Sequence, residues 1–308
     1  MEEREQEMWV YQDNKGMVWR SIKYPPGLYK IYDEILVNAA DNKQRDPKNM
    51  DTIRIDIKQA ENTISVYNNG QSLPVEIHKE EGCYVAELVF GHLLTGSNFD
   101  DSVKRVVGGR NGYGAKLCNI FSTEFTVETC DSKRKKQLKQ VQRFGRLFRS
   151  LPVVQTFTNN MKNKNEPQIT PASSSYDWTR ITFKPDLKKF KLSELTDDIV
   201  ALLTKRAYDI AGTNPNVKVF LNGARIPIKS FKDYVNLYVK NDSDDGPKIV
   251  YLEGEGNERW QLCVSVADGE FQQVSFVNSI CTMKVSVSVC VCVCVFVCVF
   301  VYLCAFVN

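Results

Sequence analysis

Apolar residues recur along the chain either at helical spacing or in alternation with polar residues, and the two patterns predict a mixture of helices and strands. Helical spacing marks residues 28–45, 84–94, 116–121, 192–211 and 229–239. Alternation marks strands at residues 52–57, 63–67, 124–129, 179–183, 217–221, 248–253, 259–266 and 271–277. Residues 132–178 are basic and then rich in Asn, Lys, Ser and Pro, which is typical of loop or irregular hairpin. Because strands and helices do not alternate strictly, we expect an α+β fold with helices on one face of a sheet, followed by the start of a second α+β unit.

The helix predicted over residues 28–45 carries an unusual group of polar side chains. At 3.6 residues per turn, four of its polar positions fall within an arc of roughly 100°. These positions hold Glu34, Asn38, Asp41 and Asn42. A solvated face is the ordinary interpretation of such a group. Several apolar residues on the same helix leave little room for a broad wet face, namely Tyr29, Ile31, Ile35 and Ala39. We therefore expect the polar group to line a pocket.

Glu34 and Asn38 lie one helical turn apart, and their side chains form a usable chemical pair. An amide oxygen can hold a hard cation, and a carboxylate can take a proton from a water molecule. The pair therefore indicates a site in which a cation and an activated water molecule are held side by side.

Residues 108–116, with the sequence GGRNGYGAK, form a second candidate site. Their glycines permit positive φ angles and a close approach of the backbone to a ligand, and a helix is predicted directly after them. Exposed N–H groups and the helix dipole would converge there on an anion, so the segment is a candidate phosphate cradle. The order of its glycines matches neither a Walker A loop nor the GxGxxG pattern of a dinucleotide fold. A purely structural loop therefore remains open at this point.

Composition and charge narrow the class of protein. Of the 308 residues, 43% are hydrophobic and 25% are charged, as in an ordinary globular protein, and the net charge of +3 is too small to indicate nucleic-acid binding. Half of the ten cysteines lie near the end of the chain, the others are scattered, and there are two histidines. Neither a zinc site, a disulfide framework nor a His-based catalytic triad is indicated. The acidic first residues lack the apolar run of a signal peptide, so we expect an intracellular protein.

Four signals together occur in the order found in one family. They are Glu34-x-x-x-Asn38, Asn68-Asn-Gly70, Gly109-x-x-Gly112-x-Gly114 and Thr179. In this order and spacing the chain resembles the GHKL ATPases, which include DNA gyrase, heat-shock chaperones, mismatch-repair proteins and histidine kinases. Segments such as PGLYKIYDEILVNAADNKQRDP, GGRNGYGAKLCNIFST and FQQVSFVNSI resemble more closely the ATPase region of eukaryotic type II DNA topoisomerases, over roughly residues 8–284.

The resemblance implies a role for each candidate residue. Glu34 would be the general base that activates water, Asn38 the ligand of Mg²⁺, and Asn42 a neighbouring phosphate or metal contact. Asn68 would lie at the adenine and ribose side, where Thr179 supports the base pocket. The other implied residues make sugar and phosphate contacts or form a lid over the triphosphate, and they are Ser97, Asn98, Arg110, Asn111, Gly112, Tyr113, Gly114, Ala115 and Lys116. ATP and Mg²⁺ are the implied cofactors, and the implied reaction is phosphoryl transfer to water.

The resemblance also implies an organisation in domains. Residues 1–227 would form a GHKL (Bergerat) ATP-binding sandwich with a mixed sheet covered by helices, and residues 228–284 would form the start of a transducer α+β domain. A full-length enzyme of this family would act in the nucleus as a homodimer. It would couple ATP-driven closure to the passage of one DNA duplex through another, and so change DNA topology and support chromosome segregation. A membrane partner is not expected.

Several departures from the family pattern put turnover in question. Ser72 stands where a second glycine is usual, and Gly96 stands where a serine is usual. We expect the family's N-terminal strap, the lysine of its Gln-Thr-Lys loop, its cleavage domain and its nucleophilic tyrosine to be missing from this sequence. A nucleotide-binding fragment without turnover is therefore the first alternative. A chaperone or histidine kinase of the same superfamily is disfavoured by the topoisomerase-like segments.

Residues 285–308 alternate Val and Cys over much of their length and need a separate interpretation. The run is long enough to cross a bilayer, which leaves a membrane-anchored protein as a further alternative. Its low complexity is typical of an aggregating β-tract, and a TGTGTG repeat read in frame encodes Cys-Val-Cys-Val, so we interpret the tail as a translated intron or repeat. Residues 141–155 also interrupt the family pattern, either as retained intron or as a genuine insertion.

Overall fold

The chain begins with an antiparallel hairpin that the sequence analysis did not predict. The computed structural model describes residues 2–92, 113–134, 136–138, 154–165, 167, 169–171, 174–239, 249–253, 260–266, 272–282 and 299–305. The hairpin consists of β1 (Arg4–Gln12) and β2 (Gly16–Tyr24), which form a sheet of their own and pack against α4 (Asp197–Thr213). The first half of β1 is exposed and mostly charged, so it lacks the alternation that would have marked it as a strand.

The long helix α1 (Pro26–Arg45) confirms the helix predicted over residues 28–45. Proline is favoured in the first turn because its missing N–H would be unpaired there, and the basic residues of the last turn suit the negative end of the helix dipole. The N–H of Asp46 closes the helix on the carbonyl of Asn42, at 2.9 Å. Buried residues lie on more than one side of α1, so the helix runs through the interior of the fold.

The main sheet has the strand order β12-β11-β3-β4-β10-β5-β6-β9, and β7 pairs with both β5 and β8. Its neighbouring strands are antiparallel, except that β11 and β3 are parallel. The bounds are Thr52–Lys58 (β3), Thr63–Asn69 (β4), Ser122–Asp131 (β5), Lys136–Leu138 (β6), Val154–Thr158 (β7), Asn163–Lys164 (β8), Ile169–Pro171 (β9), Trp178–Pro185 (β10), Lys218–Leu221 (β11) and Ala224–Arg225 (β12). The strands predicted at 52–57, 63–67, 124–129 and 179–183 are therefore confirmed.

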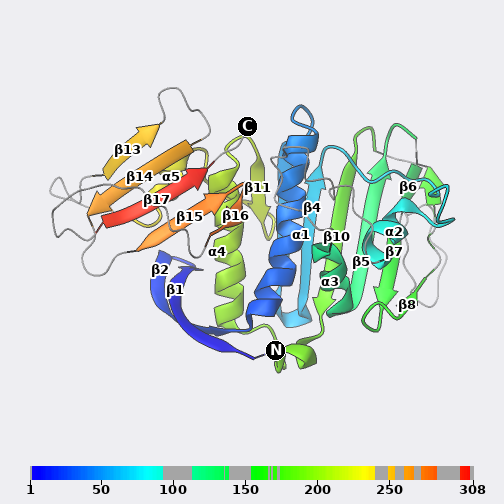
Figure 1. Ribbon diagram of the computed structural model, residues 1–308, viewed down its shortest axis with the longest axis horizontal. Helices are drawn as coiled ribbons and strands as arrows, with labels where there is room; N and C mark the ends of the chain where they lie inside the picture. The colour runs from blue at the N-terminus through cyan, green and yellow to red at the C-terminus, as the bar shows by residue number, and fades with distance from the viewer. Residues whose placement is uncertain are drawn as a thin grey trace.

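Helices cover one face of the main sheet. They are α1, α2 (Val85–Gly91), α3 (Gly114–Ile120) and α4 (Figure 1). Apolar side chains at alternate strand positions are buried in the core, and they include Ile53, Ile55, Ile64, Val66, Phe125, Val127, Ile181 and Phe183. A mixed sheet covered by helices on one face confirms the predicted α+β class.

A second sheet lies beside α4 and α5 (Phe231–Val235) and has the order β13-β14-β17-β15-β16 (Figure 1). Its bounds are Ile249–Glu253 (β13), Trp260–Val266 (β14), Gln273–Val277 (β15), Ile280–Cys281 (β16) and Val299–Ala305 (β17). β17 belongs to the Val/Cys-rich end of the chain and pairs with β14 and β15. The interpretation of residues 285–308 as a translated repeat, and the domain limits after residues 227 and 284, stay predictions.

Several predicted elements differ from the structure in extent. α4 begins at Asp197 rather than at 192, because the Thr196 hydroxyl accepts the N–H of Ile199 at 3.4 Å and caps the helix there. α5 covers five residues rather than 229–239 and begins after a capping box between Ser230 and Asp233. Residues 132–178 contain β6 to β9, which are too short for a period of two to stand out in the sequence.

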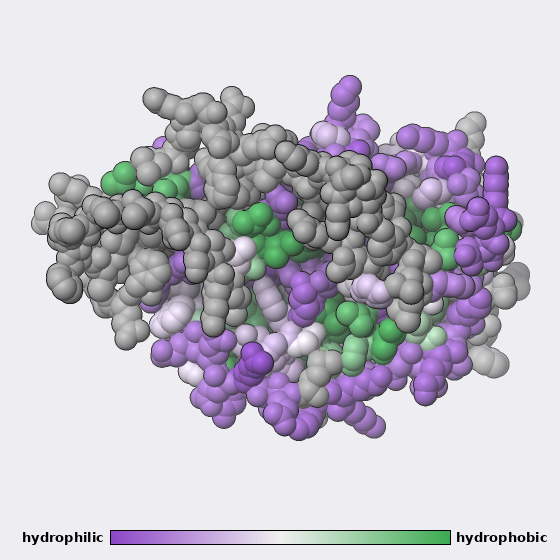
Figure 2. Space-filling model, in the orientation of Figure 1, coloured by the Kyte–Doolittle hydropathy of each residue, from purple (hydrophilic) through white to green (hydrophobic). Residues whose placement is uncertain are grey.

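On the face seen in Figure 1, polar residues gather along the lower and right-hand rim, and apolar residues show in patches nearer the centre (Figure 2). In the part of the chain that the structure describes, no helix is both long enough and apolar enough to span a membrane. Residues 283–298, which include much of the apolar tail, lie outside that part.

Candidate active site

Glu34 lies on α1 with 26% of its side chain exposed. Lys30, one turn earlier, contacts Glu34 Oε1 at 2.6 Å and Asp33 Oδ2 at 3.5 Å. Burial by itself lowers the pKa of Lys30, but the hydrogen bond to Glu34 and the charge of Asp33 outweigh it, so the pKa is raised. Lys30 therefore remains charged and holds one oxygen of the Glu34 carboxylate in place.

The end of the glycine-rich segment lies directly against this carboxylate. α3 begins at Gly114, and a methyl group at that position would lie 2.5 Å from Glu34 Cδ, 2.7 Å from Cγ and closer still to Oε2. The position has room for a hydrogen atom but not for a side chain. The polar face of α1 and the glycine-rich segment, which are far apart in the sequence, thus meet at Gly114.

The rest of the polar face of α1 is enclosed rather than wet, as expected. Asp41 and Asn42 are 7% and 3% exposed, and Asn38 is half-buried. Among the described residues, no hydrogen bond occupies the side-chain amide of Asn38, although its backbone carbonyl accepts from Arg45 Nη2 at 3.1 Å. A half-buried amide oxygen one turn from a carboxylate fits the oxygen ligands that Mg²⁺ prefers.

Two other predicted site residues converge at the end of β4. Asn42 Nδ2 and Asn68 Nδ2 both donate to the backbone carbonyl of Asn69, at 3.1 and 3.0 Å. The Asn69 side chain in turn accepts the N–H groups of Asp51 and Thr52, at 3.0 and 2.9 Å. Asn69 therefore fixes this corner of the site, a role that the sequence analysis missed although Asn69 lies inside the Asn68-Asn-Gly70 motif.

Glycine is required directly after this corner. Gly70 has φ of +89°, and a Cβ there would lie 2.6 Å from the Cβ of Met50. Both the backbone angle and the close packing exclude a side chain, so the chain turns away from β4 at this residue.

Thr179 lies in register with Asn68 across β10 and β4, and with Thr129 on β5. The hydroxyls of Thr129 and Thr179 lie 3.3 Å apart, and Thr129 Oγ1 also donates to the carbonyl of Trp178 at 3.2 Å. The sheet thus carries three polar residues side by side in an otherwise apolar layer. Thr129 was not predicted, because alternation in β5 marks it only as one more inward-facing position.

Four predicted lid residues form the beginning of α3. Tyr113 precedes the helix and is 37% exposed, Gly114 begins it, and Ala115 is buried. Lys116 is 1% exposed, and burial lowers the pKa of its ammonium. Lys116 is therefore enclosed by the fold rather than extended over its surface.

The remaining predicted contacts lie outside the described residues. They are Ser97, Asn98, Arg110, Asn111 and Gly112. Their roles stay predictions.

A further polar cluster lies around α2. The ligand atoms of Cys83, Glu87 and His92 all lie within 4.8 Å of one another. Glu87, which is buried, already forms an ion pair with Lys164, and its Oε1 lies 3.7 Å from His92 Nε2. We interpret the cluster as a buried carboxylate neutralised by a lysine.

Comparison with known proteins matches this chain and its fold to one group. A family model described as histidine kinase-, DNA gyrase B-, and HSP90-like ATPase matches residues 23–189. The chain is 56% identical over 287 residues to DNA topoisomerase 2 of Arabidopsis thaliana, and 51% identical over 280 residues to DNA topoisomerase 2-alpha of Homo sapiens. These matches cover 92% and 91% of the chain but 18% and 17% of the two relatives, so the chain spans less than a fifth of their length.

Solved structures agree with the sequence relatives. The ATPase region of Saccharomyces cerevisiae topoisomerase II is similar with a TM-score of 0.84 and 40% identity, over 99% of this chain and 80% of that one. The ATPase and transducer domains of Balamuthia mandrillaris DNA topoisomerase II give 0.78 and 47%, over 91% and 67%. The Thermus thermophilus gyrase B ATPase domain, at 0.53 and 17% identity over 82% and 61%, shares the fold.

Proposed function

The chain belongs to the histidine kinase-, DNA gyrase B-, and HSP90-like ATPase family, among the ATPase regions of type II DNA topoisomerases, and from this premise we propose how it handles its nucleotide. ATP binds between the polar face of α1 and the beginning of α3, and Glu34 drives its hydrolysis. The observation that supports this most directly is the contact of Gly114 with the Glu34 carboxylate.

Glu34 acts as the general base in this proposal. Lys30 holds Oε1 at 2.6 Å and favours the charged carboxylate, while Oε2 faces Gly114. A water molecule beside this oxygen gives up a proton as it attacks the terminal phosphate. Such a positioned base typically accounts for about 10²–10⁴-fold in rate.

Asn38 is the residue that would hold Mg²⁺. Its amide is half-buried and without a hydrogen bond in the described part of the chain, which suits a cation ligand. When bound, Mg²⁺ neutralises charge on the phosphates. Lys116 adds a positive charge from the first turn of α3.

The opposite end of the site suits the adenine and ribose. Asn68 donates to the carbonyl of Asn69, and Thr129 and Thr179 continue the polar row across the sheet. A row of amides and hydroxyls set in an apolar layer can bind the polar edge of a base while apolar neighbours pack against its faces.

The role of the whole protein is also a proposal, because the chain spans less than a fifth of its curated relatives. Their name supports a DNA topoisomerase as the whole protein. We further propose that it acts in the nucleus as a homodimer, with nucleotide-driven closure coupled to strand passage. This chain would supply the nucleotide-dependent step of that cycle.

Glu34→Gln tests the proposed hydrolysis. The glutamine side chain has the same shape as glutamate and keeps one oxygen that can accept a hydrogen bond, but its amide cannot take a proton from water. We expect its affinity for a non-hydrolysable ATP analogue to stay within about threefold, while phosphate release falls by about 100-fold or more. Glu61→Gln, on the exposed turn between β3 and β4, is the matched control and should leave both unchanged. Analogue binding by wild type without phosphate release would instead support binding without turnover.

A further inference from the structure

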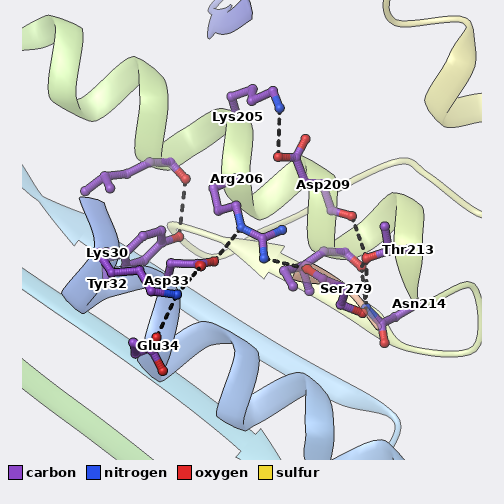
Figure 3. Close-up of polar contacts among 12 residues, drawn as sticks. Lys30, Tyr32, Asp33, Glu34, Lys205, Arg206, Asp209, Thr213, Asn214 and Ser279 are labelled. Atoms are coloured by element: carbon purple, nitrogen blue, oxygen red, sulfur yellow. Dashed lines mark hydrogen bonds and ion pairs between the residues drawn. The ribbon is translucent and has the colours of Figure 1, made fainter. Parts of the chain in front are cut away.

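Arg206 on α4 is the largest fully buried side chain among the described residues, and it joins three parts of the fold. Its Nε donates to Asp33 Oδ1 on α1 at 2.7 Å, and its Nη2 donates to the backbone carbonyl of Ser279 at 2.6 Å (Figure 3). The guanidinium therefore links the helix that carries Glu34 to the turn between β15 and β16 in the second sheet.

At the α1 end of this link, Asp33 is connected to the proposed base, Glu34, through Lys30. Asp33 directly precedes Glu34, and Lys30 lies between the two carboxylates, 3.5 Å from Asp33 Oδ2 and 2.6 Å from Glu34 Oε1 (Figure 3). A shift of Asp33 therefore moves the ammonium that orients Glu34. Tyr32, which donates to the carbonyl of Leu203 at 3.2 Å, fixes the neighbouring stretch of α1 against α4.

The other end of the link is a strained turn. β15 and β16 are joined by two residues, Asn278 and Ser279, with φ of +50° and +62°. Two positive φ angles are typical of a tight hairpin turn, in which glycine is preferred at the second position. Ser279 holds this conformation while Arg206 contacts its carbonyl and Asn214 Nδ2 contacts its hydroxyl at 3.0 Å. Polar contacts thus hold the turn against α4 and the residue that follows it, and we call the turn seated when these contacts are made.

Stability alone does not explain a charged residue here. A buried ion pair is often no more stabilising than well-packed apolar side chains of the same volume. Nη1 of Arg206 has no hydrogen-bond partner within the described residues, which costs stability further. Burial by itself lowers the pKa of Arg206, but Asp33 and other neighbours outweigh it and raise the pKa, so the group stays charged. What the guanidinium does provide is a fixed geometry between two separate elements.

We propose that Arg206 is a positioning residue that makes the orientation of Glu34 depend on the seating of the β15–β16 turn. The proposal rests on the proposed role of Glu34 in hydrolysis. When the turn is seated, Arg206 holds Asp33, and Lys30 is drawn into place against Glu34. When the turn moves away, Asp33 loses its fixed partner and the base is no longer aligned. By reciprocity, a nucleotide that contacts Glu34 favours the seated turn.

Arg206→Lys tests the link while keeping the charge. A lysine can pair with Asp33 but cannot also reach Ser279 with a planar fork. We expect kcat to fall about 10- to 100-fold with nucleotide KM within about twofold, because a misplaced group lowers the rate without removing a binding contact. Lys205→Met is the matched control, since it removes the neighbouring buried ion pair with Asp209 and the cation–π contact with Phe276 but none of the hydrogen bonds of Arg206. It should leave kcat within about twofold.

Substitutions of Ser279 test the link independently, because they leave Arg206 unchanged. Ser279→Gly removes the hydroxyl that Asn214 contacts but keeps a positive φ, so the carbonyl stays within reach of Arg206 and kcat should fall by no more than about threefold. Ser279→Pro cannot adopt that angle, because the ring holds φ near −65°, so it displaces the carbonyl and should lower kcat as Arg206→Lys does. If one of the two variants fails to fold, the other still decides the question.

Hydrogen exchange of residues 273–282 gives a readout that needs no turnover. We expect a non-hydrolysable ATP analogue to slow exchange there in wild type and in Lys205→Met, but not in Arg206→Lys. The proposal is overturned if the analogue protects the turn equally in Arg206→Lys, or if that variant and Ser279→Pro both hydrolyse ATP at the wild-type rate while Glu34→Gln does not. Wild-type hydrolysis by Glu34→Gln would instead overturn the proposed function.

Discussion

Replacing Gly114 by alanine places a methyl group against the Glu34 carboxylate. The added carbon would lie 2.5 Å from Glu34 Cδ, and ordinary contacts begin at 3.4 Å, so the carboxyl carbon or the first turn of α3 must retreat by at least about 0.9 Å. Lys30 resists this movement because it holds Oε1 at 2.6 Å. The substitution therefore displaces the proposed base from the nucleotide without altering its chemistry.

The expected loss of activity follows from that displacement. A misplacement of about 1 Å in a reacting group costs about 100-fold in rate, so we expect kcat of Gly114→Ala to fall by about that factor. The strain also affects folding. Adding a methyl group to a filled space costs about 1–3 kcal/mol, against at most about 1 kcal/mol gained from the better helix propensity of alanine, because Gly114 is the first residue of α3. The net effect is a small loss of unfolding free energy.

A double-mutant cycle isolates the contact. Phosphate release gives the rate, and urea unfolding gives the free energy for wild type, Gly114→Ala, Glu34→Ala and the double variant. In the Glu34→Ala background the methyl group has room, so Gly114→Ala should become stabilising by up to about 1 kcal/mol. An equal effect of Gly114→Ala in both backgrounds would show that the two residues do not meet and that Gly114 does not position Glu34.

Three further predictions concern the cation, the lid and the pH dependence of folding. Asn38→Ala should raise the Mg²⁺ concentration needed for half-maximal nucleotide binding by about 10-fold or more, which a Mg²⁺ titration of analogue affinity would check. Lys116→Met should weaken ATP-analogue affinity by about 10-fold in calorimetry, because it removes an enclosed positive charge beside the proposed phosphate site. Burial, with Tyr176 beside it, raises the pKa of Tyr67 to about 12, above the unfolded value of about 10. Its contribution to stability is therefore full below pH 10 and is lost as pH rises toward 12, and Tyr67→Phe should flatten that part of the urea-unfolding profile.

Those parts of the fold that rest on local pattern were predictable from the sequence. α1 has a proline at its start, a long helical period and Asp46-Pro47 at its end, and these signals agree with one another. The polar arc on α1 indicated an enclosed face because the remaining positions of the helix are apolar. Asp41 and Asn42 are indeed buried. Local signals thus sufficed for the helix that carries the proposed chemistry.

The contacts between distant elements were not predictable in this way. Arg206 pairs with Asp33, which lies 173 residues earlier in the sequence. An arginine in an amphipathic helix gives no sign of which distant carboxylate it will contact. Asn69 and Thr129 acquire their places from strand pairing, which periodicity does not specify. The β1–β2 hairpin was missed for a related reason, since it is stabilised by packing against α4 rather than by its own pattern.

A magnesium-bound triphosphate is expected to lie between the polar face of α1 and the beginning of α3. A crystal structure of this chain with Mg²⁺ and a non-hydrolysable ATP analogue tests it most directly. We expect a cation about 2.0–2.1 Å from the side-chain oxygen of Asn38, with the terminal phosphate between Glu34 and Gly114. A nucleotide bound elsewhere, with Asn38 and Glu34 untouched, would contradict it.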